Sequence, residues 1–315
     1  MHCIRPIKAG FNATGDIVYS SKKISKELAS FAFPCRKCIP CRLNMAREKA
    51  IRAYHESQMW DDNIFLTLTY DDEHLKSDRL QWIDFDLFIK RLNEKLNRGL
   101  SKENRRPLPY MVTGEYGDKT KRPHWHVLIF NFRPDDAKKH YVTELGEQVY
   151  TSEFIRDLWT HGNIEFGSVT LDSASYVARY AAKKLAHGND QDHDYHPIHN
   201  TSKKHAIGKK WIEKYHEQTF SRGYVVLPNG SQGPIPRYYQ DWYKKNHPEK
   251  WMEYDAKVKL KSKELAEMQS RKDQLDDFAN FINYRGGTNY PLSRTQVKLA
   301  ILKSKFKQLQ EKLKL

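Results

Sequence analysis

The segment YMVTGEYGDKTKRPHWHVLIF, residues 110–130, decides the fold because it has the pattern of two strands joined by a polar loop. The strands, 110–116 and 124–130, are rich in apolar, aromatic and β-branched residues, and the loop GDKTKRP carries Gly and Pro. Side chains alternate between the two faces of a strand, so His124 and His126 lie on one face. The loop length allows Glu115 to reach the same face. We therefore expect a hairpin that gathers two imidazoles and one carboxylate.

The segments on either side of this hairpin predict the rest of the fold. NIFLTLTY (63–70) and NIEFGSVT (163–170) have strand composition, whereas DFDLFIKRLNEKLNRGL (84–100) and TSEFIRDLW (151–159) have helical spacing. The order β-α-β-β-α-β is that of the ferredoxin-like, or split βαβ, arrangement. We predict an α+β fold over roughly residues 60–187, with one antiparallel sheet and helices on one face.

Composition points to a polyanionic partner. The chain has 315 residues, a net charge of +15, 18 tyrosines and seven tryptophans. Cations bind phosphates and aromatic rings stack on bases, so this mixture suits single-stranded nucleic acid. There is no run of about 18 apolar residues, and the first residues, MHCIRPIKAG, lack an apolar signal core. We expect an intracellular protein without a membrane span.

The residues Glu115, His124 and His126 form a three-sided ligand set with open positions. Such a set suits a divalent cation that must also hold substrate oxygen. The alternative is a half-exposed histidine pair on a sheet, with no ligand.

A helix with two tyrosines is predicted at DSASYVARYAAKKLAHG (172–188), where Asp172 or Ser173 is the cap and Gly188 the stop. Tyr176 and Tyr180 are four residues apart and share a face. Lys183 and Lys184 follow about one turn after Tyr180. A phenol that attacks a phosphodiester must lose its proton, despite a pKa of about 10, and needs cations near the phosphate. The alternative is that both rings only pack.

The cysteines predict a second metal site. Cys35, Cys38 and Cys41 have C-x-x-C-x-x-C spacing, and Cys3 is the fourth cysteine of the chain. Four thiolates would hold structural Zn²⁺, although an iron–sulfur cluster and replacement of Cys3 by His2 remain alternatives. The basic residues Arg36, Lys37 and Arg42 suggest that this element also faces DNA. A polar loop carries a further histidine group that we expect to be solvated rather than metal-binding, namely His187, His193, His196 and His199.

Taken together, RPHWH, YVARYAAKK and FLTLTY resemble the His-hydrophobic-His, paired-tyrosine and first-strand motifs of the HUH endonuclease superfamily. The match is to its two-tyrosine branch. CRKCIPCR and GEYGDKTKRPHWH narrow the resemblance to replication initiators of microviruses of the gokushovirus type, over roughly residues 1–245.

The resemblance implies a ferredoxin-like palm, dependence on Mg²⁺ or Mn²⁺, and nicking of viral origin DNA, single-stranded or supercoiled, followed by strand transfer in rolling-circle replication. It implies that Tyr176 and Tyr180 are nucleophiles, that Lys183 or Lys184 steadies the phosphate, and that Glu115, His124 and His126 hold the cation. Arg122 and Arg179 join the expected DNA contacts. The order in which the tyrosines act stays open.

We expect three segments: a Cys-rich zinc-binding part (1–60), the endonuclease domain (61–245) and a basic helical region (246–315). The chain contains no recognisable nucleotide-binding loop, so unwinding would need a host helicase in the bacterial cytoplasm. Two other readings remain: a zinc-containing nucleic-acid-binding protein without activity, and a transposase or relaxase of the same superfamily.

Overall fold

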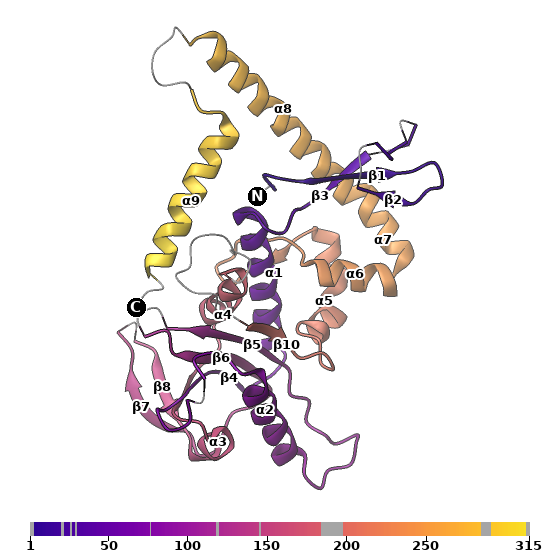
Figure 1. Cartoon of the computed structure of the whole chain (residues 1–315). Helices are drawn as coiled ribbons and strands as arrows, with labels where there is room; N and C mark the ends of the chain where they lie inside the picture. Colours follow the sequence, from indigo (N-terminus) through magenta and orange to yellow (C-terminus); the bar gives the residue numbers. More distant parts are fainter. Residues whose placement is uncertain are drawn as a thin grey trace. The chain divides into compact units, whose positions relative to one another are not determined.

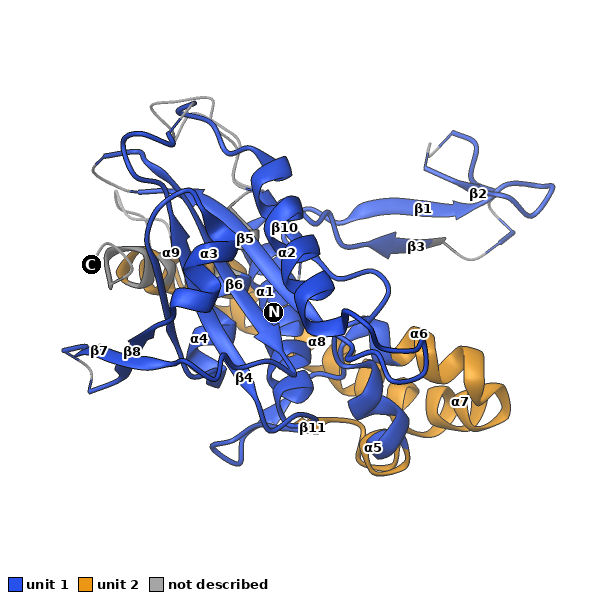
Figure 2. Cartoon of the chain, turned by 90° about the horizontal axis from the view of Figure 1, so that it is seen from below, with its two compact units in different colours: residues 1–216, 226–239 blue, residues 217–225, 240–315 orange. Residues whose placement is uncertain are grey.

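The structure is a computed structural model. It describes the residues 3–19, 22–25, 27–28, 30–75, 77–117, 120–144, 146–183, 198–284 and 291–312. Within these ranges the side chains of residues 30, 176, 179–183, 306 and 309–312 lie outside the described part. The chain forms two compact units, residues 1–216 with 226–239, and residues 217–225 with 240–315 (Figure 2).

The first unit is built on a seven-stranded sheet in the order β10-β5-β6-β4-β9-β8-β7 (Figure 1). All the pairings recorded within it are antiparallel. The strands are β4 (Asn63–Thr69), β5 (Tyr110–Tyr116), β6 (Pro123–Phe130), β7 (Lys138–Val142), β8 (Gln148–Thr151), β9 (Ile164–Gly167) and β10 (Ile198–Thr201). The predicted α+β class with an antiparallel sheet is confirmed.

Helices cover both faces of this sheet, so the prediction of helices on one face is wrong. On one face, Ile64, Leu66 and Val127 pack with α2 (Trp82–Asn97) and α3 (Glu153–Trp159). On the other face, α1 (Ile39–Ser57) and α4 (Leu171–Lys183) cover one end of β5 and β6. The buried cluster there contains Ala53, Met111, Leu128, Phe130, Ala174, Val177 and Ile207.

Alternation along β4 follows from this two-sided packing. Ile64, Leu66 and Leu68 are fully buried, whereas the residues between them are only partly buried. In β5 and β6 nearly every residue is buried, because each strand has a covered face on both sides. Gly114 is required here: a Cβ at this position would lie 2.6 Å from the Trp125 ring that crosses it.

The N-terminal part of the chain forms a three-stranded antiparallel sheet and leads into α1. Its strands are β1 (Ile7–Phe11), β2 (Ile17–Val18) and β3 (Ser30–Phe33), in the order β2-β1-β3. Pro40 lies in the first turn of α1, where a missing N–H costs nothing.

The remaining elements are mostly helical. They are α5 (Lys209–Arg222), the short pair β11 (Val225–Val226) and β12 (Gln232–Gly233), α6 (Arg237–Asn246), α7 (Pro248–Tyr254), a π-helical turn (Asp255–Lys259), α8 (Leu260–Ile282) and α9 (Arg294–Lys312). The predicted long helix from Pro248 is therefore present as α7, the π turn and α8. No described residue of α8 is buried.

Candidate metal centre

The predicted imidazole–carboxylate group forms on the hairpin of β5 and β6. Glu115 is paired with His124 in the register, and Thr113 with His126, so all four side chains lie on one face. The Nε2 atoms of His124 and His126 each lie 3.0 Å from the same oxygen, Oε1 of Glu115. The side chains are 8% (Glu115), 18% (His124) and 10% (His126) exposed, so the group is sheltered but reachable.

The hydrogen bonds behind the imidazoles determine which ring nitrogen faces the carboxylate. Nδ1 of His124 lies 3.2 Å from the Arg122 carbonyl oxygen, which can only accept, so Nδ1 carries the hydrogen. Nε2 of the neutral ring is then a lone pair that faces a carboxylate oxygen. Nδ1 of His126 lies 3.1 Å from the Thr67 hydroxyl, which can accept in the same way. Two imidazole lone pairs and a carboxylate at this distance require a cation among them, either a proton or a metal ion.

This donor set fits a divalent metal ion. Ligating histidines usually donate their second N–H to a carbonyl, carboxylate or other outer group, as His124 and His126 do here. The three ligand atoms lie within 4.8 Å of one another. Burial acts to raise the pKa of Glu115, but hydrogen bonds and charge from His124 and His126 outweigh it and lower the pKa below its ordinary value. Glu115 is therefore ionised at neutral pH, as a ligand must be.

A hydroxyl bridge joins this group to α4. The Oγ1 of Thr113, the cross-strand neighbour of His126, donates to the Val177 carbonyl at 3.2 Å and lies 2.8 Å from His199 Nδ1. Ala174, Val177 and Ala178 are fully buried. The backbone of α4 is thus held against the sheet next to the imidazole–carboxylate group.

The positions of the predicted nucleophiles follow from this helix. Tyr176, Tyr180 and Lys183 lie in α4, on either side of the anchored Val177 carbonyl. Their side chains, and that of Arg179, lie outside the described part, as does the whole of Lys184.

The four predicted cysteines come together at the N-terminus of α1. Their sulfur atoms lie within 4.8 Å of one another, with 3.9 Å between those of Cys3 and Cys38. A tetrahedral zinc with Zn–S bonds of about 2.3 Å would place its sulfurs roughly 3.8 Å apart. Cys3 therefore takes part in the group; His2 lies outside the described residues.

The thiols of this group differ in acidity. Burial acts to raise the pKa of Cys35, but N–H groups of Cys38 and Lys37 and the neighbouring thiols bring it to about 6. Burial, together with hydrogen bonds and charge from neighbouring thiols, raises the pKa of Cys41 to about 12. Four such sulfurs can all be thiolates only around a cation, so the cluster also fits a metal ion.

The expected DNA-contacting cations fall in different surroundings. Arg36 and Lys37 are exposed. Arg42, by contrast, is only 8% exposed and does not present its guanidinium to DNA. Arg122 forms an ion pair with Asp72 and donates to the Tyr70 carbonyl, at the entrance to β6.

The second histidine group cannot be assembled from the structure. His187, His193 and His196 lie outside the described residues. His199 lies on β10, paired with Thr113, so it belongs to the second row behind the imidazole–carboxylate group.

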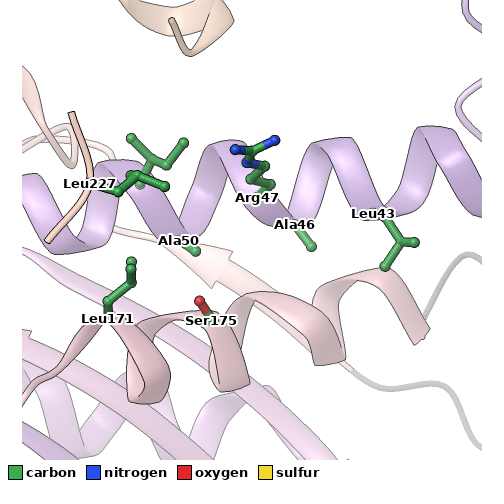
Figure 3. A pocket seen from close by; sticks show the side chains of 8 residues that line it. Leu43, Ala46, Arg47, Ala50, Leu171, Ser175 and Leu227 are labelled. Atoms are coloured by element: carbon green, nitrogen blue, oxygen red, sulfur yellow. The ribbon is translucent and has the colours of Figure 1, made fainter. Parts of the chain in front are cut away.

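A cavity of about 210 Å³ lies between α1 and α4, apart from both metal-binding groups (Figure 3). Its lining is mainly aliphatic, with Arg47 and Ser175 as polar exceptions. The guanidinium of Arg47 donates to the Gln232 carbonyl at 3.1 Å.

Thr67 and Thr113 are the functional residues that sequence reasoning missed. Both are threonines at positions of the same parity as the imidazole–carboxylate group once the strands are aligned. That register was the signal from which they could have been found.

Comparison with known proteins places this hairpin and helix in a family. Residues 63–185 match the family model of the replication-associated protein ORF2. The chain is 31% identical over 225 residues to the replication-associated protein ORF4 of Chlamydia phage 1, covering 69% of this chain and 54% of that protein. It is 28% identical over 310 residues to the replication-associated protein ORF2 of Spiroplasma virus 4, covering 90% of this chain and 95% of that protein. No solved structure matches the chain significantly.

Residues 63–185 therefore belong to this family of phage replication-associated proteins, and the resemblance predicted from the motifs is confirmed. The matched range contains β4, β5, β6, β9 and α4, the elements that carry the imidazole–carboxylate group and the two tyrosines. The chain spans about half the length of the Chlamydia phage 1 relative. Among the described residues, no helix is long and apolar enough to cross a membrane.

Proposed function

We propose that this protein initiates rolling-circle replication of a phage genome as a metal-dependent, tyrosine-nucleophile endonuclease and strand transferase of the HUH type. The observation that carries the proposal is the pair of Nε2 atoms 3.0 Å from one Glu115 oxygen, on a sheet joined to the tyrosine helix through Thr113. The order β5-β6-β4-β9, with α2 and α3 on one face, is that of a split βαβ palm and supports the same assignment.

The reaction is a transesterification. The phenol oxygen of Tyr176 or Tyr180 forms a bond to the scissile phosphorus, and the bond from phosphorus to the 3′ oxygen breaks. The phenol proton passes to solvent and the 3′ oxygen takes one up, leaving a 5′-phosphotyrosine and a free 3′-OH. A second attack by the other tyrosine repeats the exchange, and the freed 3′-OH rejoins the displaced strand as a circle.

The residues of the chain have separate tasks in this scheme. Glu115, His124 and His126 would hold Mg²⁺ or Mn²⁺, which would withdraw charge from the phosphate. Thr67 and the Arg122 carbonyl fix the tautomers of the two imidazoles. Lys183 and Lys184 would steady the phosphate. Arg36, Lys37, Arg122 and Arg179 would contact viral origin DNA.

The cysteine group has a structural role in this proposal. Cys3, Cys35, Cys38 and Cys41 would hold Zn²⁺ and fix the start of α1, which covers one face of the sheet. The exposed residues Arg36 and Lys37 lie within this element, so the same fold presents positive charge to DNA.

An adduct assay tests the proposal. Zinc-loaded protein is incubated with single-stranded origin DNA and Mn²⁺, and we expect a covalent protein–DNA product that resists denaturation. The double variant Tyr176→Phe, Tyr180→Phe should form none, while the control Tyr19→Phe, which alters a tyrosine 63% exposed in the N-terminal segment, should react normally. An adduct from the double variant would disprove the nucleophile assignment.

The main competitor is a binding protein without activity. Such a protein would hold DNA equally well with and without Mn²⁺ and leave the strand intact. A transposase or relaxase of the superfamily would give the adduct but act on other DNA, so substrate choice separates it from the initiator.

A further inference from the structure

The hairpin of β7 and β8 carries an aromatic–carboxylate group that the proposed reaction does not use. The register of β7 against β8 is broken between Lys139 and Val142. Such a bulge re-aims side chains, and here both His140 and Tyr141 reach Glu165 of β9. The Tyr141 hydroxyl donates to Glu165 Oε2 at 3.0 Å, and His140 Nε2 lies 3.9 Å from Oε1.

This group lies on the same face of the sheet as the imidazole–carboxylate group. Thr67 of β4 is paired with His126 on one side and with Glu165 on the other, so the three side chains point to the same face. Two strand spacings, about 10 Å, separate the strand of His126 from that of Glu165. A single strand whose phosphate sits at His124 and His126 would therefore bring a neighbouring nucleotide over Glu165.

We propose that His140, Tyr141 and Glu165 form a binding site for the base of a nucleotide next to the cleaved phosphate, with preference for a base that carries an exocyclic amino group. This site rests on the proposed function, because it takes the single strand that the tyrosines would cut.

The exposed rings provide the stacking surface. Tyr141 is 45% exposed, the His140 side chain is 54% exposed, and the centres of the two rings lie 5.1 Å apart. Base–aromatic stacking tolerates any base, so these rings contribute affinity rather than selectivity. The Gln148 amide donates to the Tyr141 carbonyl at 2.9 Å and fixes the backbone that carries the ring.

The carboxylate provides the selectivity. Oε2 of Glu165 accepts from Tyr141, whereas Oε1 is too far from His140 Nε2 for a hydrogen bond and can accept another. A carboxylate oxygen accepts from cytosine N4, and adenine N6 is a donor of the same kind. A phosphate would be repelled by Glu165, so the base rather than the backbone faces it.

Binding of short fluorescent homopolymers of dC, dA and dT, measured by anisotropy without added Mg²⁺ or Mn²⁺, tests the site. Zinc-loaded wild type should bind dC and dA about fivefold or more tighter than dT. Tyr141→Ala should weaken binding of all three by about tenfold, and Tyr141→Phe should retain it because the ring remains. Glu165→Gln should reduce the preference for dC over dT.

Two matched controls separate the site from general effects. Tyr19→Ala removes a tyrosine exposed elsewhere, and Lys139→Ala removes a charge whose cross-strand partner, Tyr150, lies on the opposite face. The inference is wrong if Tyr141→Ala binds no worse than Tyr19→Ala, or if wild type does not distinguish dC from dT. Because this assay needs no cleavage, failure of the adduct assay would overturn the nucleophiles without affecting this result, and the reverse also holds.

Discussion

Replacement of Thr67 by valine tests whether the hydroxyl behind His126 prepares the metal ligand. The substitution keeps the shape of the side chain and removes the Oγ1 that lies 3.1 Å from His126 Nδ1. Loss of such an outer partner typically reduces metal affinity by about 10- to 100-fold. The Phe65 ring, stacked on His126 at 5.6 Å, still holds the plane of the imidazole. We therefore expect the lower end, about tenfold, or ~1.4 kcal/mol.

The assay is a titration with Mn²⁺, followed by electron paramagnetic resonance of the free ion. Mn²⁺ prefers oxygen and imidazole ligands to thiolates, so zinc-loaded protein reports on Glu115, His124 and His126. Thr69→Val is the matched control: it is the same change on the same strand, but the Thr69 hydroxyl donates to the Asn163 carbonyl. Equal loss in the two variants, or wild-type affinity in Thr67→Val, would refute the reasoning.

Three further predictions concern other parts of the fold. Cys38→Ser should lower bound zinc, measured by elemental analysis, and lower the melting temperature; wild-type protein that binds no zinc would contradict the assignment. Thr113→Val removes the bond to the Val177 carbonyl and should cost about 1–3 kcal/mol in urea unfolding; an unchanged unfolding curve would contradict the bridge. Burial lowers the pKa of His55 from 6.5 to about 3, so the unfolded chain binds the extra proton between these values and stability falls as pH drops through that window. At pH 5 wild type should lose about 2 kcal/mol that His55→Phe keeps; parallel stability–pH curves for the two would show that His55 does not titrate as inferred.

The central strands could be predicted because their burial follows the local pattern. Along β4, β5, β6 and β9 the apolar residues recur as the sheet requires, and the observed bounds lie close to the predicted ones. The outer strands could not be predicted in this way. β7 is exposed throughout and β10 has the sequence IHNT, so neither has an apolar face that marks it as a strand.

The second helical layer was missed for a related reason. Helices α1 and α4 meet through Ala46, Ala50 and Ala178. Alanines bury little area, so they do not stand out as an apolar stripe, yet they allow two helices to approach closely.

The site shows the same division between local and long-range information. Glu115, His124 and His126 lie in one hairpin, so their common face follows from strand alternation alone. Thr67 and Arg42 depend on packing between segments distant in sequence. The pattern could not indicate that Thr67 supports His126, or that Arg42 becomes buried beside the cysteine group.

The arrangement also explains why small residues surround the tyrosines. Reactive groups displaced by about 1 Å can cost roughly 100-fold in rate, so a nucleophile on a helix is useful only if the helix has one position on the sheet. The Thr113–Val177 hydrogen bond fixes α4 along the strand, and Ala174 and Ala178, with no exposed surface, fix its distance from the sheet and from α1. A larger side chain at Ala178 would separate α4 from α1, because this residue is fully buried against Ala46 and Ala50. The alanines therefore act as spacers for the reaction as well as for the core, and the tyrosines are held in register with the imidazole–carboxylate group by contacts that carry no chemistry of their own.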